Sequence, residues 1–236
     1  MKTPRTKKGF TLIELLVVIG IIALLASIAL PAFTSVQVKA KQAKEISNVK
    51  QIGTLLKVYA SDNNGNFPTN ALDANLNPTG TPVGDSNSAF AQLFPAYNTN
   101  EQIFWTTNAG FGQTPPDNKI DIPMLQAHQY TLAGNECSWA YVLGLNETSD
   151  SRFPLVADAM TDKGAHTYIY AQNTVGGLWQ GKAIVLNVDI SAAIQKVNAA
   201  DNTIHGSPLG ADLFNTTEAN WMSASNVVAN PLATGT

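Results

Sequence analysis

The first feature of the chain is an uninterrupted apolar run near its start. The nineteen residues from Leu15 to Phe33 carry no charged side chain, and one carboxylate, Glu14, stands directly before them. As a helix, this run is about 28 Å long at 1.5 Å per residue, which is close to the thickness of the hydrocarbon core of a bilayer. The pattern therefore predicts a membrane-spanning helical segment over residues 10–33.

The helix is expected to continue beyond the apolar run. Hydrophobic residues recur at steps of three and four from Val36 to Tyr59, which is the spacing of one buried helix face. Gly65 and Pro68, in the stretch "SDNNGNFP", indicate where the helix ends. The sequence thus predicts one helix over residues 10–61, whose second part, residues 34–61, is amphipathic.

The remaining residues, 62–236, are expected to form a soluble domain that contains a small antiparallel sheet. Short apolar or alternating runs bounded by turn residues predict its strands, namely 101–107, 138–145, 166–172 and 182–191. The stretch "SAFAQLFPAY" predicts a short helix, and "NPTGTPVGDSNS" is typical of a loop. The predicted fold class is α+β, with the long N-terminal helix packed on the sheet.

Charge is distributed unevenly along the chain, although the net charge is only −3. Residues 1–9 and residues 34–61 each carry a net charge of +4, whereas residues 62–236 hold five basic and fifteen acidic residues. Phosphate contacts require clustered Lys and Arg side chains. No nucleic-acid partner is therefore expected for the domain. Its negative charge is expected to attract cations.

Three explanations of the apolar segment compete, and Glu14 distinguishes among them. A secretory signal peptide could be cut near the small residues 27–29, and a plain membrane anchor would explain the length of the run. A carboxylate deep in a bilayer costs about 2.5–3.5 kcal/mol on insertion scales. A plain anchor does not explain why Glu14 is present. A third explanation is therefore needed in which the carboxylate has a function.

The third explanation comes from the resemblance of this segment to a known family of signals. The stretch "KKGFTLIELLVVIGIIALLASIALP" resembles the class III signal of type IV pilins and of type II secretion pseudopilins. The resemblance implies that a prepilin peptidase cleaves between Gly9 and Phe10, removes residues 1–9 as a leader, and methylates the new amine of Phe10. Glu14 and Pro31 then match the family's glutamate and its helix-bending proline, and Glu14 is expected to meet the amine of a neighbouring subunit.

A second resemblance concerns the end of the long helix. "LLKVYASDNNGNFPT" is similar to the corresponding region of major pseudopilins, and the single cysteine, Cys137, excludes the C-terminal disulfide of many type IVa pilins. The implied protein is a pseudopilus subunit that polymerises with itself and contacts an assembly platform and inner-membrane lipids. It would cross the bacterial inner membrane once, with a periplasmic domain. The alternatives are a type IV pilin of a surface filament and an anchored binding domain that never polymerises.

Candidate chemistry in the domain is sparse. Major pseudopilins often bind calcium through carboxylates, and the resemblance makes four aspartates weak calcium candidates, namely Asp158, Asp162, Asp189 and Asp201. His166 could join Asp158 and Asp162 in a metal site only if they shared a helix face, which Gly164 disfavours. No enzyme is expected, because the histidines belong to no recognisable catalytic motif. Cys137 is expected to be a buried, inert thiol, and the tryptophans are expected to pack in the core or at an interface.

Overall fold

The computed structural model describes seven parts of the chain, of which Trp179 alone is one. They are residues 10–72, 78–106, 114–120, 131–168, 179, 181–218 and 221–232, without the side chains of Pro31, Ala32, Leu72 and Pro78. The chain divides into two compact units, residues 1–43 and residues 44–236. Each unit is described separately below.

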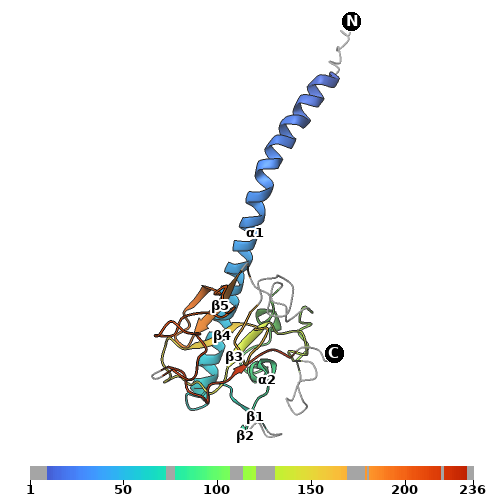
Figure 1. Cartoon of the computed structure of the whole chain (residues 1–236). Helices are drawn as coiled ribbons and strands as arrows, with labels where there is room; N and C mark the ends of the chain where they lie inside the picture. The colour runs from blue at the N-terminus through green and yellow to red at the C-terminus, as the bar shows by residue number, and fades with distance from the viewer. Residues whose placement is uncertain are drawn as a thin grey trace. The chain divides into compact units, whose positions relative to one another are not determined.

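One long helix, α1 (Leu12–Asp62), confirms the helix that the sequence predicts (Figure 1). It begins two residues after Phe10 and ends one residue after Ser61. Gly65 closes the helix by donating its N–H to the carbonyl of Ala60 at 2.8 Å, with a φ of 78° that glycine adopts readily. The turn residues of "SDNNGNFP" therefore end the helix where the sequence predicts.

The second unit is built on a five-stranded antiparallel sheet, in the order β6-β5-β4-β3-β7. Its strands are β3 (Trp139–Val142), β4 (Pro154–Asp158), β5 (Lys182–Asn187), β6 (Ala192–Lys196) and β7 (Val228–Ala229). A separate antiparallel pair joins β1 (Asn70–Leu72) to β2 (Pro78–Pro82). The short helix α2 (Ser86–Ala91) and the 3-10 helix η1 (Glu101–Phe104) lie between these two sheets in sequence.

The second half of α1 packs closely on this sheet, which confirms the predicted α+β architecture. Ile52 and Leu56 are fully buried, while Val36, at the start of the same predicted stripe, is 61% exposed. Gly53 lets the helix approach the sheet, because a Cβ atom at that position would lie 2.7 Å from Cδ2 of Leu186 in β5. The stripe is thus a core face only in the part of α1 that belongs to the second unit.

Two local predictions in the domain are wrong. Residues 101–104 form η1 instead of a strand, because the Asn100 side chain caps the turn by accepting from the N–H of Gln102. The stretch predicted to be a loop contains β2 and the start of α2. Asp85 accounts for the helix start, since its side chain accepts the N–H of Ser88 as an N-cap.

The sheet confirms part of the strand predictions and adds strands that they lack. β3 and β5 lie inside the predicted runs 138–145 and 182–191. In the predicted strand 166–172, Thr167 forms only an isolated bridge with Asp162, and residues 169–172 lie outside the described residues. β4, β6 and β7 have no counterpart in the sequence-based prediction, although β4 is fully buried between two neighbours.

Candidate assembly segment and acidic sites

A capping box fixes the start of α1. Thr11 precedes the first helical residue, and its hydroxyl accepts the N–H of Glu14 at 3.3 Å. The Glu14 carboxylate accepts in return from the N–H of Thr11 at 2.8 Å and from its hydroxyl at 2.7 Å. This reciprocal arrangement satisfies N–H groups that an open helix end leaves unpaired. Glu14 therefore has a local structural role in the isolated chain, in addition to any role in assembly.

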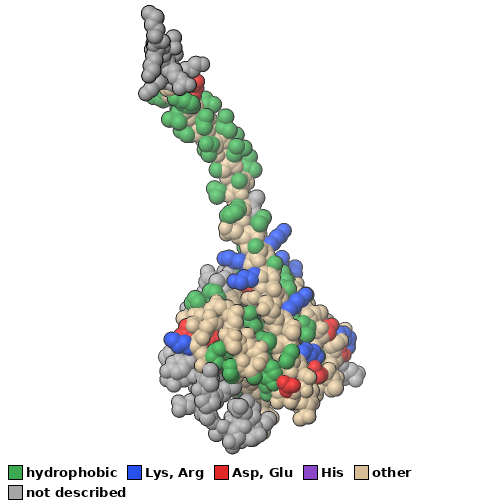
Figure 2. All heavy atoms as spheres, turned by 180° about the vertical axis from the view of Figure 1, so that it is seen from behind, with side chains coloured by type: hydrophobic (Ala, Val, Ile, Leu, Met, Phe, Trp, Pro, Cys, Tyr) green, Lys and Arg blue, Asp and Glu red, His purple; other side chains and the backbone are tan. Residues whose placement is uncertain are grey.

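The first part of α1 exposes a continuous apolar surface (Figure 2). The large apolar side chains that the structure describes between Phe10 and Val36 range from 46% exposed at Val18 to 81% exposed at Leu12. Within the described residues, α1 is the helix whose length and hydropathy would allow it to cross a membrane. No described residue covers this surface, and an exposed apolar surface of this length is typical of a segment that contacts lipid or other helices.

The predicted processing residues lie at this end of the chain. Gly9 falls outside the described residues, and Phe10 is described and 75% exposed. Residue 31 belongs to the continuous helix α1, but the side chain of Pro31 is outside the described set. Phe10 and Glu14 are therefore the two predicted residues whose surroundings are visible, and both are accessible to another molecule.

The four calcium candidates do not gather into one site. Asp158 ends β4 and is fully buried, where its Oδ2 accepts the N–H of Ile184 at 2.7 Å and its Oδ1 has no partner among the described residues. Burial raises the pKa of Asp158 to about 7. A carboxylate that is protonated near neutral pH is a poor ligand for calcium.

The other three candidates cap turns. Asp162 accepts the N–H groups of Gly164 and Ala165, and these hydrogen bonds lower its pKa. Asp189 and Asp201 cap the turns that follow them in the same way, and their pKa values are lowered as well. Among the residues that the structure describes, no three Asp, Glu, His or Cys side chains are arranged to hold a metal ion. Calcium binding remains a prediction.

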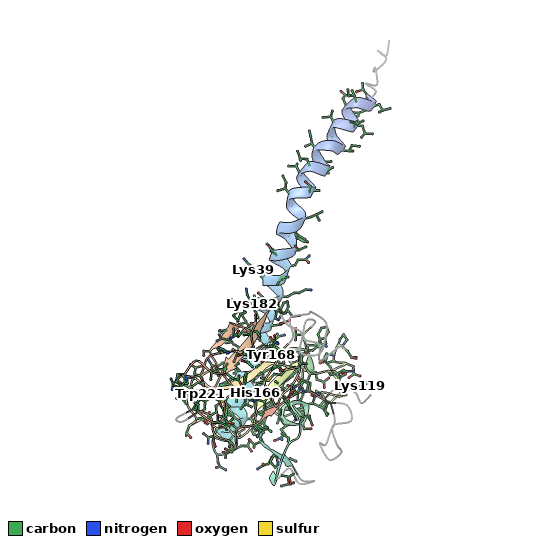
Figure 3. The ribbon with its side chains drawn as sticks, in the orientation of Figure 1. Lys39, Lys119, His166, Tyr168, Lys182 and Trp221 are labelled. Atoms are coloured by element: carbon green, nitrogen blue, oxygen red, sulfur yellow. The ribbon has the colours of Figure 1, made fainter. Side chains whose placement is uncertain are left out.

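Two histidines pair with aspartates, one of which, Asp212, lies outside the predicted set while the other, Asp201, belongs to it. His166, labelled in Figure 3, contacts the carboxylate of Asp212 instead of joining Asp158 and Asp162. His205 lies 2.6 Å from the carboxylate of Asp201. The first contact joins two distant segments of the domain, whereas the second lies within one segment, between residues four apart. His128 lies outside the described residues.

Buried glutamates are a feature that the sequence analysis missed. Glu101, at the start of η1, is fully buried, and its Oε1 accepts the N–H of Leu132 at 2.7 Å. Burial raises its pKa to about 7, and the nearby carboxylate of Glu136 contributes to the shift. Glu45, on α1, is also buried and accepts a hydrogen bond from the hydroxyl of Thr106. The only sequence signal was the position of Glu45 beside the apolar stripe, one residue before Ile46.

Burial of Cys137 is confirmed, and so is core packing for the tryptophans other than Trp105, which is half-buried. Cys137 is completely buried, and burial raises the pKa of its thiol to about 12. Trp179 and Trp221 are 2% and 8% exposed, so they pack in the core. Neither the thiol nor these two indoles is available at the surface.

Comparison with known protein families identifies the N-terminal segment. Residues 4–30 match the family described as "Prokaryotic N-terminal methylation motif". The type II secretion system core protein G of Aeromonas hydrophila is 41% identical over 81 residues, which cover 33% of this chain and 56% of that protein. The type IV major pilin protein PilA of Myxococcus xanthus is 44% identical over 59 residues, 25% of this chain and 26% of that protein.

A third relative is similar over nearly the same length of this chain. The type IV wide pilus major component PilA4 of Thermus thermophilus is 35% identical over 79 residues, 34% of this chain and 60% of that protein. The chain thus spans between about a quarter and three fifths of the length of these relatives. No solved structure is significantly similar to the chain.

Proposed function

We propose that this chain is the structural subunit of a type II secretion pseudopilus. The methylation motif and the homology to type II secretion core protein G and to type IV pilins support a pilin-family subunit. In this proposal, residues 1–9 are the leader, residues 10–33 span the inner membrane, and residues 34–61 lead into the domain 62–236 in the periplasm. Subunits assemble into a short filament that drives protein secretion. The relatives are structural subunits and not enzymes, and we infer the same for this chain.

The observation that carries the proposal is the exposed apolar surface of α1, which has one carboxylate, Glu14, in its first turn. In the membrane this surface faces lipid, and in a filament it faces the equivalent helices of other subunits. Small residues such as Gly20 favour close approach of such helices, and no described residue elsewhere in the chain lies within 4 Å of a Cβ atom built on Gly20. One surface can thus serve storage in the membrane and assembly afterwards.

Glu14 supplies the register of assembly in this proposal. Cleavage after Gly9 leaves a positively charged amine on Phe10, and a neighbouring Glu14 can neutralise it. Two unit charges about 4 Å apart attract by roughly 4 kcal/mol at an effective dielectric constant of 20. Removing one partner of a buried pair leaves an uncompensated charge and is costly. The exposed position of Glu14 at the first turn of α1 supports this role, because the carboxylate is within reach of another subunit.

The test combines processing with assembly. We expect mass spectrometry of the mature protein to find a methylated Phe10 as the first residue. We expect Glu14→Ala to be processed but not to assemble, whereas Glu147→Ala, which removes an exposed carboxylate in the domain, should do both. An intact leader, a cut near residues 27–29, or normal assembly of Glu14→Ala would each overturn the proposal.

A second candidate function is the type IV pilin, supported by the similarity to PilA of Myxococcus xanthus over 59 residues. Two features favour the pseudopilin. The end of the long helix resembles that of major pseudopilins, and a single cysteine cannot form the intrachain disulfide that closes the C-terminal loop of many type IVa pilins. Shearing cells that express the chain at its native level distinguishes the two. Long fibres in the sheared fraction would establish the pilin, and their absence, together with loss of secretion in a deletion strain, would establish the pseudopilin.

A further inference from the structure

A pocket in the domain is lined mainly by carboxamide side chains. It has a volume of about 520 Å³, within the size range of small-molecule sites. The side-chain amides that line it are Asn63, Asn64, Asn66, Asn70, Gln92 and Asn146. We call this site the amide pocket, and all of its residues belong to the second unit of the chain.

The walls of the amide pocket come from segments that are bonded to one another. The turn after α1 bridges to the turn after β3 through Asn66 and Asn146, and the N–H of Glu147 donates to the carbonyl of Gly65 at 2.9 Å. Gln92, which follows α2, accepts from the hydroxyl of Tyr59 at 3.0 Å and donates to the carbonyl of Asn70 at 3.0 Å. These bonds hold the pocket open in one arrangement, which lowers the cost of ordering it around a ligand.

Several of the amides keep unused hydrogen-bonding capacity. The side chains of Asn64 and Asn70 form no hydrogen bond to any residue that the structure describes. Asn66 and Asn146 are each bonded through one end of the amide only, since Asn66 donates to Asn63 and Asn146 accepts from Thr148. Each amide offers an acceptor and two donors. The pocket therefore presents paired donors and acceptors that a ligand can use.

The remaining lining defines the chemistry of the ligand. No Lys or Arg lines the pocket, and its one carboxylate, Asp62, already accepts from the hydroxyl of Tyr97 at 3.1 Å. Tyr59, Phe67 and Leu145 add an apolar part to the lining. The lining itself offers an anion no cationic side chain, although the ammonium of Lys57 lies 5.3 Å from the ring centroid of Phe67. An apolar ligand would leave the amides unpaired. A neutral molecule with many hydroxyl groups and an apolar ring face matches both parts of the lining.

We propose that the amide pocket binds a neutral carbohydrate of one or two sugar rings. Sugar hydroxyls both donate and accept, as carboxamides do, so each can pair with either end of an Asn side chain. The C–H face of the ring would lie against the apolar part of the lining. This site uses none of the residues proposed for assembly, such as Phe10 and Glu14, so its binding can be measured independently of assembly.

The test uses the full-length chain in detergent micelles and the sugars N-acetylglucosamine and diacetylchitobiose as probes. Saturation-transfer NMR measures binding, with glucuronic acid and a capped trialanine peptide as comparison ligands. We expect binding of the neutral sugars in preference to both comparison ligands. The double variant Asn64→Gly/Asn70→Ala should weaken that binding at least tenfold, while its urea unfolding midpoint changes little. These side chains bond to no described residue, and glycine is used at Asn64 because its φ of 55° is one that glycine adopts readily.

A matched control removes a carboxamide outside the pocket. Gln51→Ala deletes an exposed side chain on α1 whose bond is to the carbonyl of Ser47 in its own helix, and it should bind sugar like the wild type. The proposal is overturned if neither neutral sugar binds at 10 mM, if the acid or the peptide binds better, or if the double variant binds sugar unchanged. The assay involves no processing or assembly, so its failure leaves the proposed filament function intact.

Discussion

Asp158 offers the clearest quantitative test of the domain's energetics. The variant Asp158→Asn keeps an oxygen that can accept the N–H of Ile184 but removes the charge. In the folded chain the wild-type carboxyl is fully buried, and its pKa is raised from 3.8 to about 7. Below about pH 4 both states of the wild-type chain carry a protonated Asp158, so the charge costs nothing there.

The sign of the pH dependence follows from that shift. Between about pH 4 and pH 7, the folded wild type holds a proton that the unfolded chain has lost, so wild-type stability falls as the pH rises. A shift of three units at 1.36 kcal/mol per unit corresponds to about 4 kcal/mol, which is an upper limit for one group. Asp158→Asn removes this loss, but its amide N–H₂ is left without a buried partner, at a cost of about 1–3 kcal/mol at every pH.

We therefore expect the difference in the free energy of unfolding, variant minus wild type, to increase by up to about 4 kcal/mol from pH 4 to pH 8. Urea unfolding of the detergent-solubilised chain, followed by the fluorescence of buried tryptophans, measures this difference. Glu101 also has a pKa raised to about 7, but it is present in both proteins, so its contribution cancels in the comparison.

Asp189→Asn serves as the control with the opposite sign. Hydrogen bonds from Ser191 lower the pKa of Asp189, so the stability that this carboxylate contributes is present above its unfolded pKa and is lost as the pH falls. The control should therefore lose ground on the wild type only as the pH rises toward about 4, and its difference from the wild type should stay nearly constant between pH 4 and pH 8. If the difference between wild type and Asp158→Asn is the same at pH 4 and at pH 8, the buried carboxyl titrates normally and the reasoning is refuted.

Three further outcomes follow from contacts described above. Gly53→Ala should destabilise the domain by about 1–3 kcal/mol through overpacking against Leu186. Thr54→Ala, on the exposed side of α1, should change stability little. Equal urea midpoints for both variants would contradict this packing. Thr11→Ala should cost about 0.5–2 kcal/mol of helix stability by removing the cap, seen as faster amide exchange in the first turn of α1, and Thr11→Ser should restore slow exchange. Cys137 should not react with a maleimide at pH 8 until urea unfolds the chain, because its pKa is raised to about 12, and labelling of the folded protein would show that the thiol is accessible.

The helix and its ends were predictable because they depend on local chemistry. The apolar run and the turn at Gly65 each act within a few residues, and the structure shows the helix and its end at the predicted places or next to them. The Thr11–Glu14 capping box is equally local, but the sequence analysis did not predict it. The strands β3 and β5, which flank the central strand β4, were also predictable, since they lie in apolar runs rich in β-branched and aromatic residues.

The parts that were missed depend on contacts between distant segments. β4 is five residues long and begins with Pro154, and β6 contains two alanines and a lysine, so neither has a strong strand signal of its own. Residues 101–104 have strand-like composition but are held as η1 by caps from Asn100 and Asn118. The burial of Glu101 was equally hidden, because its partner at Leu132 lies far along the chain.

The position of β7 affects the order of events during synthesis. β3 completes its pairing only with Val228 and Ala229, which leave the ribosome after every other strand of the sheet. Until then Tyr141 and Val142 lack their partners on that edge of β3, although the first part of α1 was synthesised long before. In the proposed topology the subunit is therefore anchored before its domain can close, and export has to finish before folding does.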